Sequence, residues 1–291
     1  MIDIIQLAIN GVAVGSIYAL AALGFILVYN ATGVVNFAAG HFVMIGAFFG
    51  ILTILQLDLN SWLSYPLAIA LSAGFGGLFF LLVHFPLRHR SALSIIIGTV
   101  MMGIAIQNAA LLFWGPWPYQ LPSLFGDGVF NLYGATVSVH AMATIFITVA
   151  LIVVLYAVLQ LLPVGRSMRA VAQDPQTARL IGLPVAKLLA FSWIMAAILA
   201  GFAGLLVAPM WFADASMAES IGLKAFAATI IGGFGSLPGA ILGGVLVGLI
   251  EVMGAAYIST SFKDLFAFVV MIIFLIVRPQ GIFGEPISDR G

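Results

Sequence analysis

The chain has 291 residues, of which 63% are hydrophobic and 7% are charged, and its formal net charge at pH 7 is zero. Soluble domains carry about 25% charged residues, so this composition excludes a soluble globule and indicates a protein of the lipid bilayer. The neutral balance, without lysine and arginine clustered among aromatic residues, argues against nucleic acid as a partner. Because cysteine is absent, disulfides, thiol catalysis and cysteine-bound metals are excluded, and the scattered histidines predict no metal site.

The first half of the chain contains five long apolar stretches. A helix of about 20 apolar residues spans a bilayer, so each stretch is predicted to cross the membrane. The first has no basic region before it and is too long for a signal peptide, so we expect it in the mature protein. The second is marked by Gly40, Gly46 and Gly50. The predicted spans are residues 4–29, 36–55, 61–85, 93–114 and 138–162.

A polar segment at residues 163–187, PVGRSMRAVAQDPQTARLIGLPVAK, interrupts the apolar pattern. Asp174 is predicted to cap a helix that starts at Pro175, because Asp accepts from free backbone N–H groups and proline has none to lose there. Gly182 followed by Pro184 ends that helix, which predicts a short helix at 175–181. A second short helix is expected at 166–172. The segment is interpreted as a lever on the cytoplasmic face, with an ordinary basic loop that fixes topology as the alternative.

The second half contains four further apolar segments, at residues 187–209, 223–234, 238–257 and 263–277. The segment at 223–234 is too short to span the bilayer as a straight helix. From residue 232 to 248 the sequence GGFGSLPGAILGGVLVG predicts a helix that is packed very closely or broken, with Pro238 removing a backbone donor. A broken helix in lipid is costly unless its freed groups line water, ligand or protein, so this pattern favours a transport pathway over close packing alone.

The loops between these segments predict an orientation. Arg88 and Arg90, and the arginines of 163–187, place their loops in the cytoplasm by the positive-inside rule. The loop at 115–139 has no Lys or Arg and one acid, Asp127, so we expect it outside, together with 210–222. The N-terminus is then external and the C-terminus cytoplasmic. The aromatic residues of the outer loop are interpreted as an interfacial belt, or else as a landing surface for an external protein.

About nine segments predict an inverted repeat. Segments one to four and six to nine are offset by five, an odd number, so the two quartets cross the membrane in opposite directions. Each quartet opens with a small-residue span that is followed by a short glycine-rich segment. This arrangement is typical of transporters, whose path lies where the broken segments meet, although any glycine-rich membrane protein has weak self-similarity. The predicted fold is an all-α polytopic membrane protein of about eight to nine transmembrane segments, in one domain over residues 1–291.

Ionisable residues inside predicted spans are functional by default, because burying a charge in lipid is costly. Glu251, His41 and Lys224 are the candidates. An ion-driven carrier would keep an acid at mid-membrane, whereas Glu251 is predicted near the outer end, where interfacial packing explains it better. The chain has no Gly-Lys dipeptide and therefore no phosphate-binding loop of the Walker A type. If transport depends on ATP, the ATPase is another chain.

Four ordered motifs resemble one family over nearly the whole chain. RAVAQDPQTARLIGLPV is similar to the cytoplasmic loop of ABC importer permeases, and NFAAGHFVMIGAF, AFAATIIGGFGSLPGAILGGVLVGLIE and RPQGIFG resemble LivH-type permeases of branched-chain amino-acid uptake systems. The resemblance implies a subunit of the bacterial inner membrane beside a LivM-like second permease, two cytoplasmic ATPases that bind ATP and Mg²⁺, and an external substrate-binding protein. It implies no cofactor in this chain and no enzymatic activity. The coupling residues it implies are Arg169, Ala170, Ala172, Asp174, Pro175, Ala178 and Gly182.

The substrate path is predicted where residues 36–50 face residues 232–248 and the second permease. A zwitterionic ligand needs dipoles there, which helix starts and the side chains of Asn36 and His41 can supply. Relatives often carry His or Gln where this chain has Ala39 and an acid where it has His41, so a urea or short-amide permease is the alternative to an amino-acid permease. A stand-alone channel or ion-coupled carrier is a further alternative. The predicted path residues are Asn36, Gly40, His41, Gly232, Gly233 and Gly235.

Overall fold

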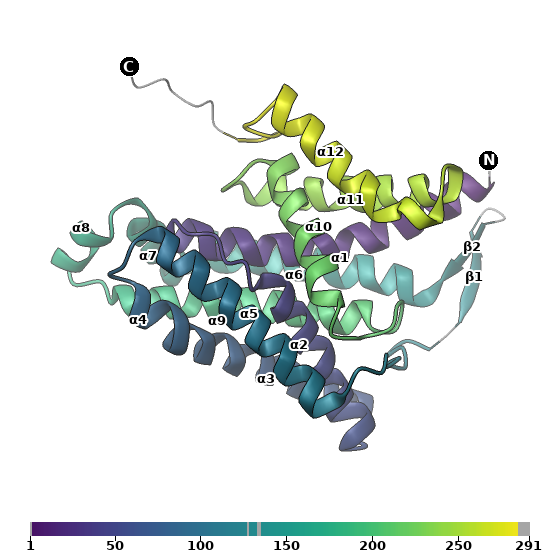
Figure 1. Ribbon diagram of the computed structural model, residues 1–291, viewed down its shortest axis with the longest axis horizontal. Coiled ribbons are helices and arrows are strands. Elements are labelled where there is room, and N and C mark those ends of the chain that lie inside the picture. The colour runs from purple at the N-terminus through teal and green to yellow at the C-terminus, as the bar shows by residue number, and fades with distance from the viewer. Residues whose placement is uncertain (1, 127, 133–134, 285–291) are drawn as a thin grey trace.

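The computed structural model describes residues 2–126, 128–132 and 135–284, and within them the chain is a bundle of helices with one small hairpin (Figure 1). Asp127 and the tail at 285–291 lie outside the described residues. The elements of the first half are α1 (Ile2–Thr32), α2 (Ala39–Ile51) with a π-helical turn η1 (Leu52–Gln56), α3 (Ser61–Phe79) with a second π-helical turn η2 (Phe80–His84), α4 (Phe85–Leu87), α5 (Ala92–Trp114), β1 (Val129–Leu132) and β2 (Ala135–Ser138). The second half contains α6 (Val139–Gln160), α7 (Pro163–Gln173), α8 (Pro175–Leu180), α9 (Val185–Val207), α10 (Met217–Gly232), α11 (Leu237–Tyr257), a 3₁₀ turn η3 (Thr260–Phe262) and α12 (Lys263–Val277).

Eight helical segments of the described residues are long and apolar enough to cross a membrane. The ninth segment, α10, has 16 residues, which gives a length of about 24 Å against a hydrocarbon core of about 30 Å. The prediction of an all-α polytopic membrane protein with a short broken segment is therefore confirmed.

The predicted start of the short segment at residue 223 is wrong, because α10 begins at Met217. Asp214 Oδ1 accepts hydrogen bonds from the backbone N–H groups of Ser216 (2.6 Å) and Met217 (3.1 Å). These bonds satisfy donors that a helix start leaves free, so the helix begins six residues earlier than the hydrophobic pattern indicates. Glu219, predicted in an outer loop, therefore lies on α10.

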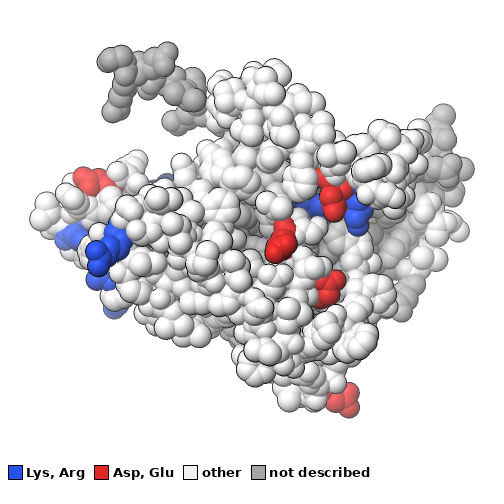
Figure 2. All heavy atoms as spheres, in the orientation of Figure 1, with Lys and Arg blue, Asp and Glu red and all other residues white. Residues whose placement is uncertain are grey.

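The loop between α5 and α6 contains the antiparallel hairpin of β1 and β2, which the sequence analysis did not predict. In addition, Tyr119 and Ala213 exchange backbone hydrogen bonds of 2.9 and 2.7 Å. This bridge joins the loop after α5 to the loop after α9, so the two predicted outer loops share one end of the bundle. At the opposite end lie α7 and α8 and the turn after α4, whose arginines are Arg166, Arg169, Arg179, Arg88 and Arg90, and Lys and Arg atoms gather at that end of the molecule in Figure 2.

The packing of the helices repeats itself in the way that the predicted repeat requires. α1 packs against α9, α10 and α11, and α9 packs against α1, α2 and α3. Likewise α2 contacts α3 and α5, while α10 contacts α11 and α12. The helices of the two halves can thus be matched in order: α1 with α9, α2 with α10, α3 with α11 and α5 with α12. Each of these contacts then has a counterpart between the matched helices, which supports the predicted inverted repeat.

Glycines allow the central helices to approach backbone to backbone. In α11, Gly248 lies against the backbone of Gly15 in α1, and a Cβ at the neighbouring Gly244 would lie 2.5 Å from the Ala19 amide nitrogen. In α2, a Cβ at Gly46 would lie 2.5 Å from Cα of Gly201 in α9. No side chain fits in these positions, so the glycine-rich pattern at 232–248 serves close packing along α11.

A buried polar cluster joins α1, α10, α11 and α12. Lys224 Nζ lies 2.7 Å from Glu251 Oε1 and 2.7 Å from Asp264 Oδ1, and it donates to the Tyr18 hydroxyl (3.2 Å). Tyr18 in turn donates to Glu251 Oε2 (2.7 Å). Lys224 is 1% and Glu251 3% exposed, so Glu251 is packed within the helix bundle as a buried ion pair. Each buried charge has an opposite charge and a hydrogen bond, which is the arrangement that burial demands.

We expect Gly248→Ala to lower the free energy of unfolding by about 1–3 kcal/mol, because the new methyl group must displace the α1 backbone. Gly74→Ala on α3 is the matched control, since a Cβ there has no other atom within 4 Å. The measurement is thermal unfolding of both variants in detergent. Equal melting temperatures for the two would contradict the packing argument.

We expect Lys224→Met to cost about 3–5 kcal/mol of stability, because it leaves the Glu251 carboxylate buried without its cation. The double variant Lys224→Met/Glu251→Met removes both buried charges and should recover part of that loss. Chemical unfolding of the wild type, both single variants and the double variant measures this coupling. Losses that simply add would show that the two charges do not stabilise each other.

Candidate coupling loop and substrate path

The polar segment at 163–187 folds as predicted from its capping residues. Asp174 Oδ1 accepts from the N–H groups of Gln176 (2.8 Å) and Thr177 (3.1 Å) at the start of α8. The hydrogen bond from the Thr177 hydroxyl lowers the pKa of Asp174 most, and the two backbone N–H donors lower it further. The capping carboxylate of Asp174 is therefore kept ionised. Gly182 has a φ of +84° and ends the helix. The predicted helices at 166–172 and 175–181 are confirmed as α7 and α8.

α7 is fixed to the end of α6. The Arg169 guanidinium donates to the carbonyl of Leu159, and Gly165 lies against the same carbonyl with no room for a side chain. Met168 and Val171 are buried, whereas Ala170 is half-buried and Ala172 exposed. The base of the loop is therefore packed, and its tip, α8, projects from the bundle (Figure 1).

The exposed surface of α8 differs from the predicted one. Ala178 is 2% exposed, so the prediction that it contacts a partner is wrong; its side chain packs inward. Instead Leu180 is 87% and Ile181 69% exposed, with Arg179 exposed beside them. Two large apolar side chains at the tip of a polar loop favour a protein partner. The signal in the sequence was the pair Leu180–Ile181 immediately before the helix-ending glycine.

Three of the predicted path residues lie at the start of α2. Asn36 is 2% exposed and its Oδ1 accepts from the N–H of Ala38 (3.0 Å), so its side chain shapes the turn before α2. Gly40 lies against the backbone of Ala218 and Gly222, where α2 and α10 cross. His41 is 8% exposed, and neither ring nitrogen has a hydrogen-bond partner among the described residues.

The other three path residues form the turn between α10 and α11. Gly233 (φ +106°) and Gly235 (φ +88°) adopt left-handed conformations that favour glycine. Gly232 lies against Gly239 of α11. The carbonyls of Ile231 and Gly232 accept from Ile282 and Phe283, both at 2.9 Å, so this turn pairs with the C-terminal segment.

The prediction that residues 36–50 face residues 232–248 is wrong. α2 packs against α9, α10 and α3, whereas α11 packs against α1, α10 and α12. The physical reason is that α10 lies between the two, with Gly222 against α2 and Ala228 against Gly243 of α11. The predicted path residues therefore form two separate groups. Gly40 and His41 lie at the start of α2, and Gly232, Gly233 and Gly235 lie in the turn between α10 and α11.

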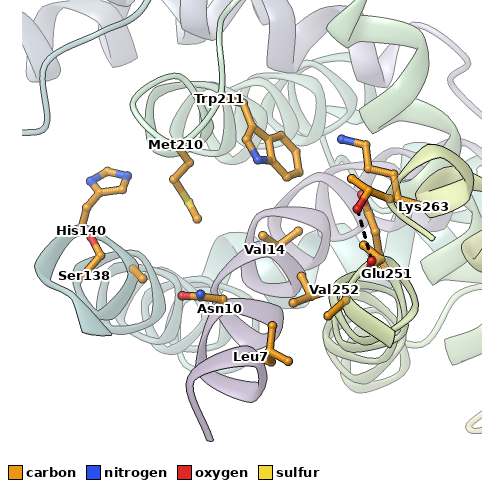
Figure 3. A pocket seen from close by; sticks show the side chains of 14 residues that line it. Leu7, Asn10, Val14, Ser138, His140, Met210, Trp211, Glu251, Val252 and Lys263 are labelled. Atoms are coloured by element: carbon orange, nitrogen blue, oxygen red, sulfur yellow. Dashed lines mark hydrogen bonds between the residues drawn. The ribbon is translucent and has the colours of Figure 1, made fainter. Parts of the chain in front are cut away.

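A cavity of about 530 Å³ opens beside α1, α6 and α11 (Figure 3). Asn10 and Val14 of α1 lie on one side of it, and Met210 and Trp211 point into it from the loop after α9. Lys263 lies 5.2 Å from the centre of the Trp211 ring. The sequence did not predict this cavity. It is lined by both polar and apolar side chains and lies at the end of the bundle where the loops after α5 and α9 meet. It can hold a small polar molecule or water.

A second cavity, of about 290 Å³, lies where α2, α5 and α10 meet. His41 lines it together with Glu219, and the remaining walls are mostly apolar. Neither Glu219 nor this cavity was predicted, because the sequence placed Glu219 in a loop. A hollow with an acid, an imidazole and apolar walls can hold a small molecule that is charged at one end and apolar at the other.

Known proteins resemble this chain throughout its length. It is 32% identical to the high-affinity branched-chain amino acid transport system permease protein LivH of Salmonella typhimurium, over 98% of this chain and 97% of LivH. It is also 32% identical, with the same coverage, to the permease protein BraD of Pseudomonas aeruginosa. The solved structure of PsaBC from Streptococcus pneumoniae in complex with Fab matches with a TM-score of 0.52, covering 95% of this chain and 92% of that chain. At 16% identity this last match shows the fold alone.

The family model described as "Branched-chain amino acid transport system / permease component" matches residues 7–275. That range contains all the membrane-spanning helices except the ends of the first and last. With 32% identity to LivH over nearly the full length of both chains, the chain belongs to the permease-component family of branched-chain amino acid transport systems.

Proposed function

We propose that this chain is the membrane permease subunit of a binding-protein-dependent ABC importer for branched-chain or other small apolar amino acids. The observation that carries the proposal is the chain-long similarity to LivH and BraD, together with a packed polar loop whose tip exposes Leu180 and Ile181. A second permease, like LivM, completes the path. An external binding protein delivers the substrate.

Energy reaches the chain from two cytoplasmic ATPases that bind ATP and Mg²⁺. The chain has no Gly-Lys dipeptide for a phosphate-binding loop, which is consistent with a transport subunit that does not hydrolyse ATP itself. α8 is the docking element, with Gln176, Arg179, Leu180 and Ile181 on its exposed surface. Asp174, Pro175 and Gly182 set the ends of this helix, Ala178 packs it inward, and Arg169 holds the preceding helix α7 on α6.

The arginine-bearing end of the bundle faces the cytoplasm by the positive-inside rule. The N-terminus and the loops at 115–138 and 208–216 are then external, and the C-terminus is internal. Gly40 and His41, at the crossing of α2 and α10, contribute to the substrate path, and Gly232, Gly233 and Gly235 form the turn at its cytoplasmic end. Asn36 contributes through the backbone it positions.

The urea or short-amide alternative is less well supported by the cavity at His41. Its walls include Phe25, Phe37 and Phe226, which suit an apolar side chain better than an amide. An ion-coupled carrier is disfavoured because Glu251 is already paired with Lys224. Purification distinguishes a channel, since a channel conducts in liposomes as a single chain, whereas a permease subunit needs its ATPases.

We expect Leu180→Glu to abolish leucine uptake and binding-protein-stimulated ATP hydrolysis, because a carboxylate replaces an apolar contact with the ATPase. The matched control is Trp117→Glu, an equally exposed apolar residue at the opposite end of the bundle, which should still co-purify with the ATPases. Uptake is measured in proteoliposomes that contain the whole importer. Normal stimulation of the Leu180→Glu complex would contradict the docking role of α8.

The orientation is tested by cysteine labelling, which is clean because the chain has no cysteine. Trp117→Cys should react with an impermeant maleimide added to intact cells. Leu180→Cys should react only after the cells are permeabilised. Both side chains are more than two-thirds exposed, at 73% and 87%, so access within the chain does not limit the reaction. The reverse pattern would show that the orientation is inverted.

A further inference from the structure

Glu219 is a charged residue in an unusual place. It lies on α10, five residues before the buried Lys224, and its side chain is exposed. Among the described residues it has no ion pair or hydrogen bond to another side chain. Acidic atoms reach the surface over α10 in Figure 2. An ionised carboxylate on a membrane-embedded helix is costly in contact with lipid, so this surface must face water, ligand or protein.

His41 lines the same cavity as Glu219 and is also unpartnered. Its ring is held against α5 at Gly103, where a Cβ would lie 2.7 Å from the Cε1 atom of His41. The residue is 8% exposed, and both Nδ1 and Nε2 lack a hydrogen-bond partner among the described residues. A buried imidazole with two unused nitrogens loses hydrogen bonds on folding unless something else supplies a partner.

The start of α2 adds a third polar feature. Phe37 and His41, which flank this helix start, both line the cavity. The N-cap residue Ala38 provides no side-chain hydrogen bond to the first turn, and the first turn contains no acid. The N–H groups of Ala38 and Ala39 already donate to Asn36, so the start of α2 contributes the positive end of the helix dipole to the cavity.

The remaining walls of the cavity are apolar. Phe226 lies 6.0 Å from Phe25 and 5.7 Å from Phe37, measured between ring centres. Val100 and Ile104 of α5 and Leu223 of α10 complete the lining. The cavity thus combines an acid, a positively polarised end and an apolar wall within about 290 Å³.

We propose that this cavity is a binding subsite for a zwitterionic amino acid with an apolar side chain. Glu219 pairs with the ammonium group, His41 and the start of α2 bind the carboxylate, and the phenylalanines contact the side chain. The inference rests on the proposed function and adds to it the groups that recognise the substrate. Ile104 and Leu223 are 47% and 50% exposed and form the rim of this cavity.

The test uses the whole importer in proteoliposomes, with leucine as the probe. We expect Glu219→Gln to lower the rate of leucine uptake about tenfold, because a neutral amide loses the charge-assisted bond to the ammonium group. Glu219→Asp keeps the charge and should retain part of the rate. Asp58→Asn is the matched control, since it removes another exposed acid at a positive φ that asparagine tolerates. It should transport normally.

The imidazole is tested in the same way. His41→Phe retains an aromatic ring but has no ring nitrogens, so it should lower leucine uptake. His41→Gln supplies an amide N–H donor and should transport leucine faster than His41→Phe. A second measurement does not depend on transport rate. Ile104→Cys in the importer should be protected from N-ethylmaleimide by leucine with its binding protein and ATP, while Leu112→Cys, on the same helix but outside the cavity lining, should react equally with and without leucine.

The outcomes separate the two proposals. A wild-type importer that takes up no leucine contradicts the proposed function, whatever the variants do. A wild-type importer that transports leucine, with an unchanged rate for Glu219→Gln, overturns the subsite. Loss of the second permease from the purified Glu219→Gln complex also overturns it, because Glu219 would then be an interface ion pair. Absence of leucine protection at Ile104→Cys overturns it even if a cavity variant fails to fold.

Discussion

Close approach of helix backbones at glycine is the constraint on which the rest of this structure depends. Lipid tails are as apolar as the helices, so burial from water does not hold the helices together, and packing at small residues must. α11 lies on α1 at Gly248 and Gly15, and α2 lies on α9 at Gly46 and Gly201. These contacts remove the room for side chains along both seams. The same kind of contact lets two short helices cross: α2 and α10 meet at Gly40 and Gly222, where neither helix has a side chain.

That crossing gives α10 two different surfaces. Glu219 has an exposed side chain beside the cavity at His41, whereas Lys224, five residues further along the helix, is buried against Glu251 and Tyr18. The buried cation joins α10 to α1 and α11 and balances the acid that α11 contributes. The exposed acid has no such balance within the described residues. A single short helix therefore combines a fixed internal charge with one that is free to meet a ligand.

Local signals in the sequence predicted the local features of the fold. The ends of α8 follow from Asp174, Pro175 and Gly182, which act within one helical turn, and the spans follow from apolar length. The main errors concern the start of α10 and the tertiary contacts. The hydrophobic pattern at α10 starts after the true helix, because Asp214 caps a polar first turn. The inward face of Ala178 and the position of α10 between α2 and α11 depend on how helices pack, which no residue pattern along one segment specifies.

The loop that contains α7 and α8 is connected by contacts to the crossing of α2 and α10. α7 contacts α1 as well as α6 and α9, and Asn30 at the end of α1 donates to the Gly235 carbonyl (2.9 Å) in the turn after α10. Met168, Asn30 and Leu237 surround one small cavity at this junction. Contacts thus run without a break from the loop of α7 and α8 to the C-terminal end of α10. Because α10 is one continuous helix from Met217 to Gly232, the helix that meets this junction at its C-terminal end also carries Glu219 and the cavity beside it near its start.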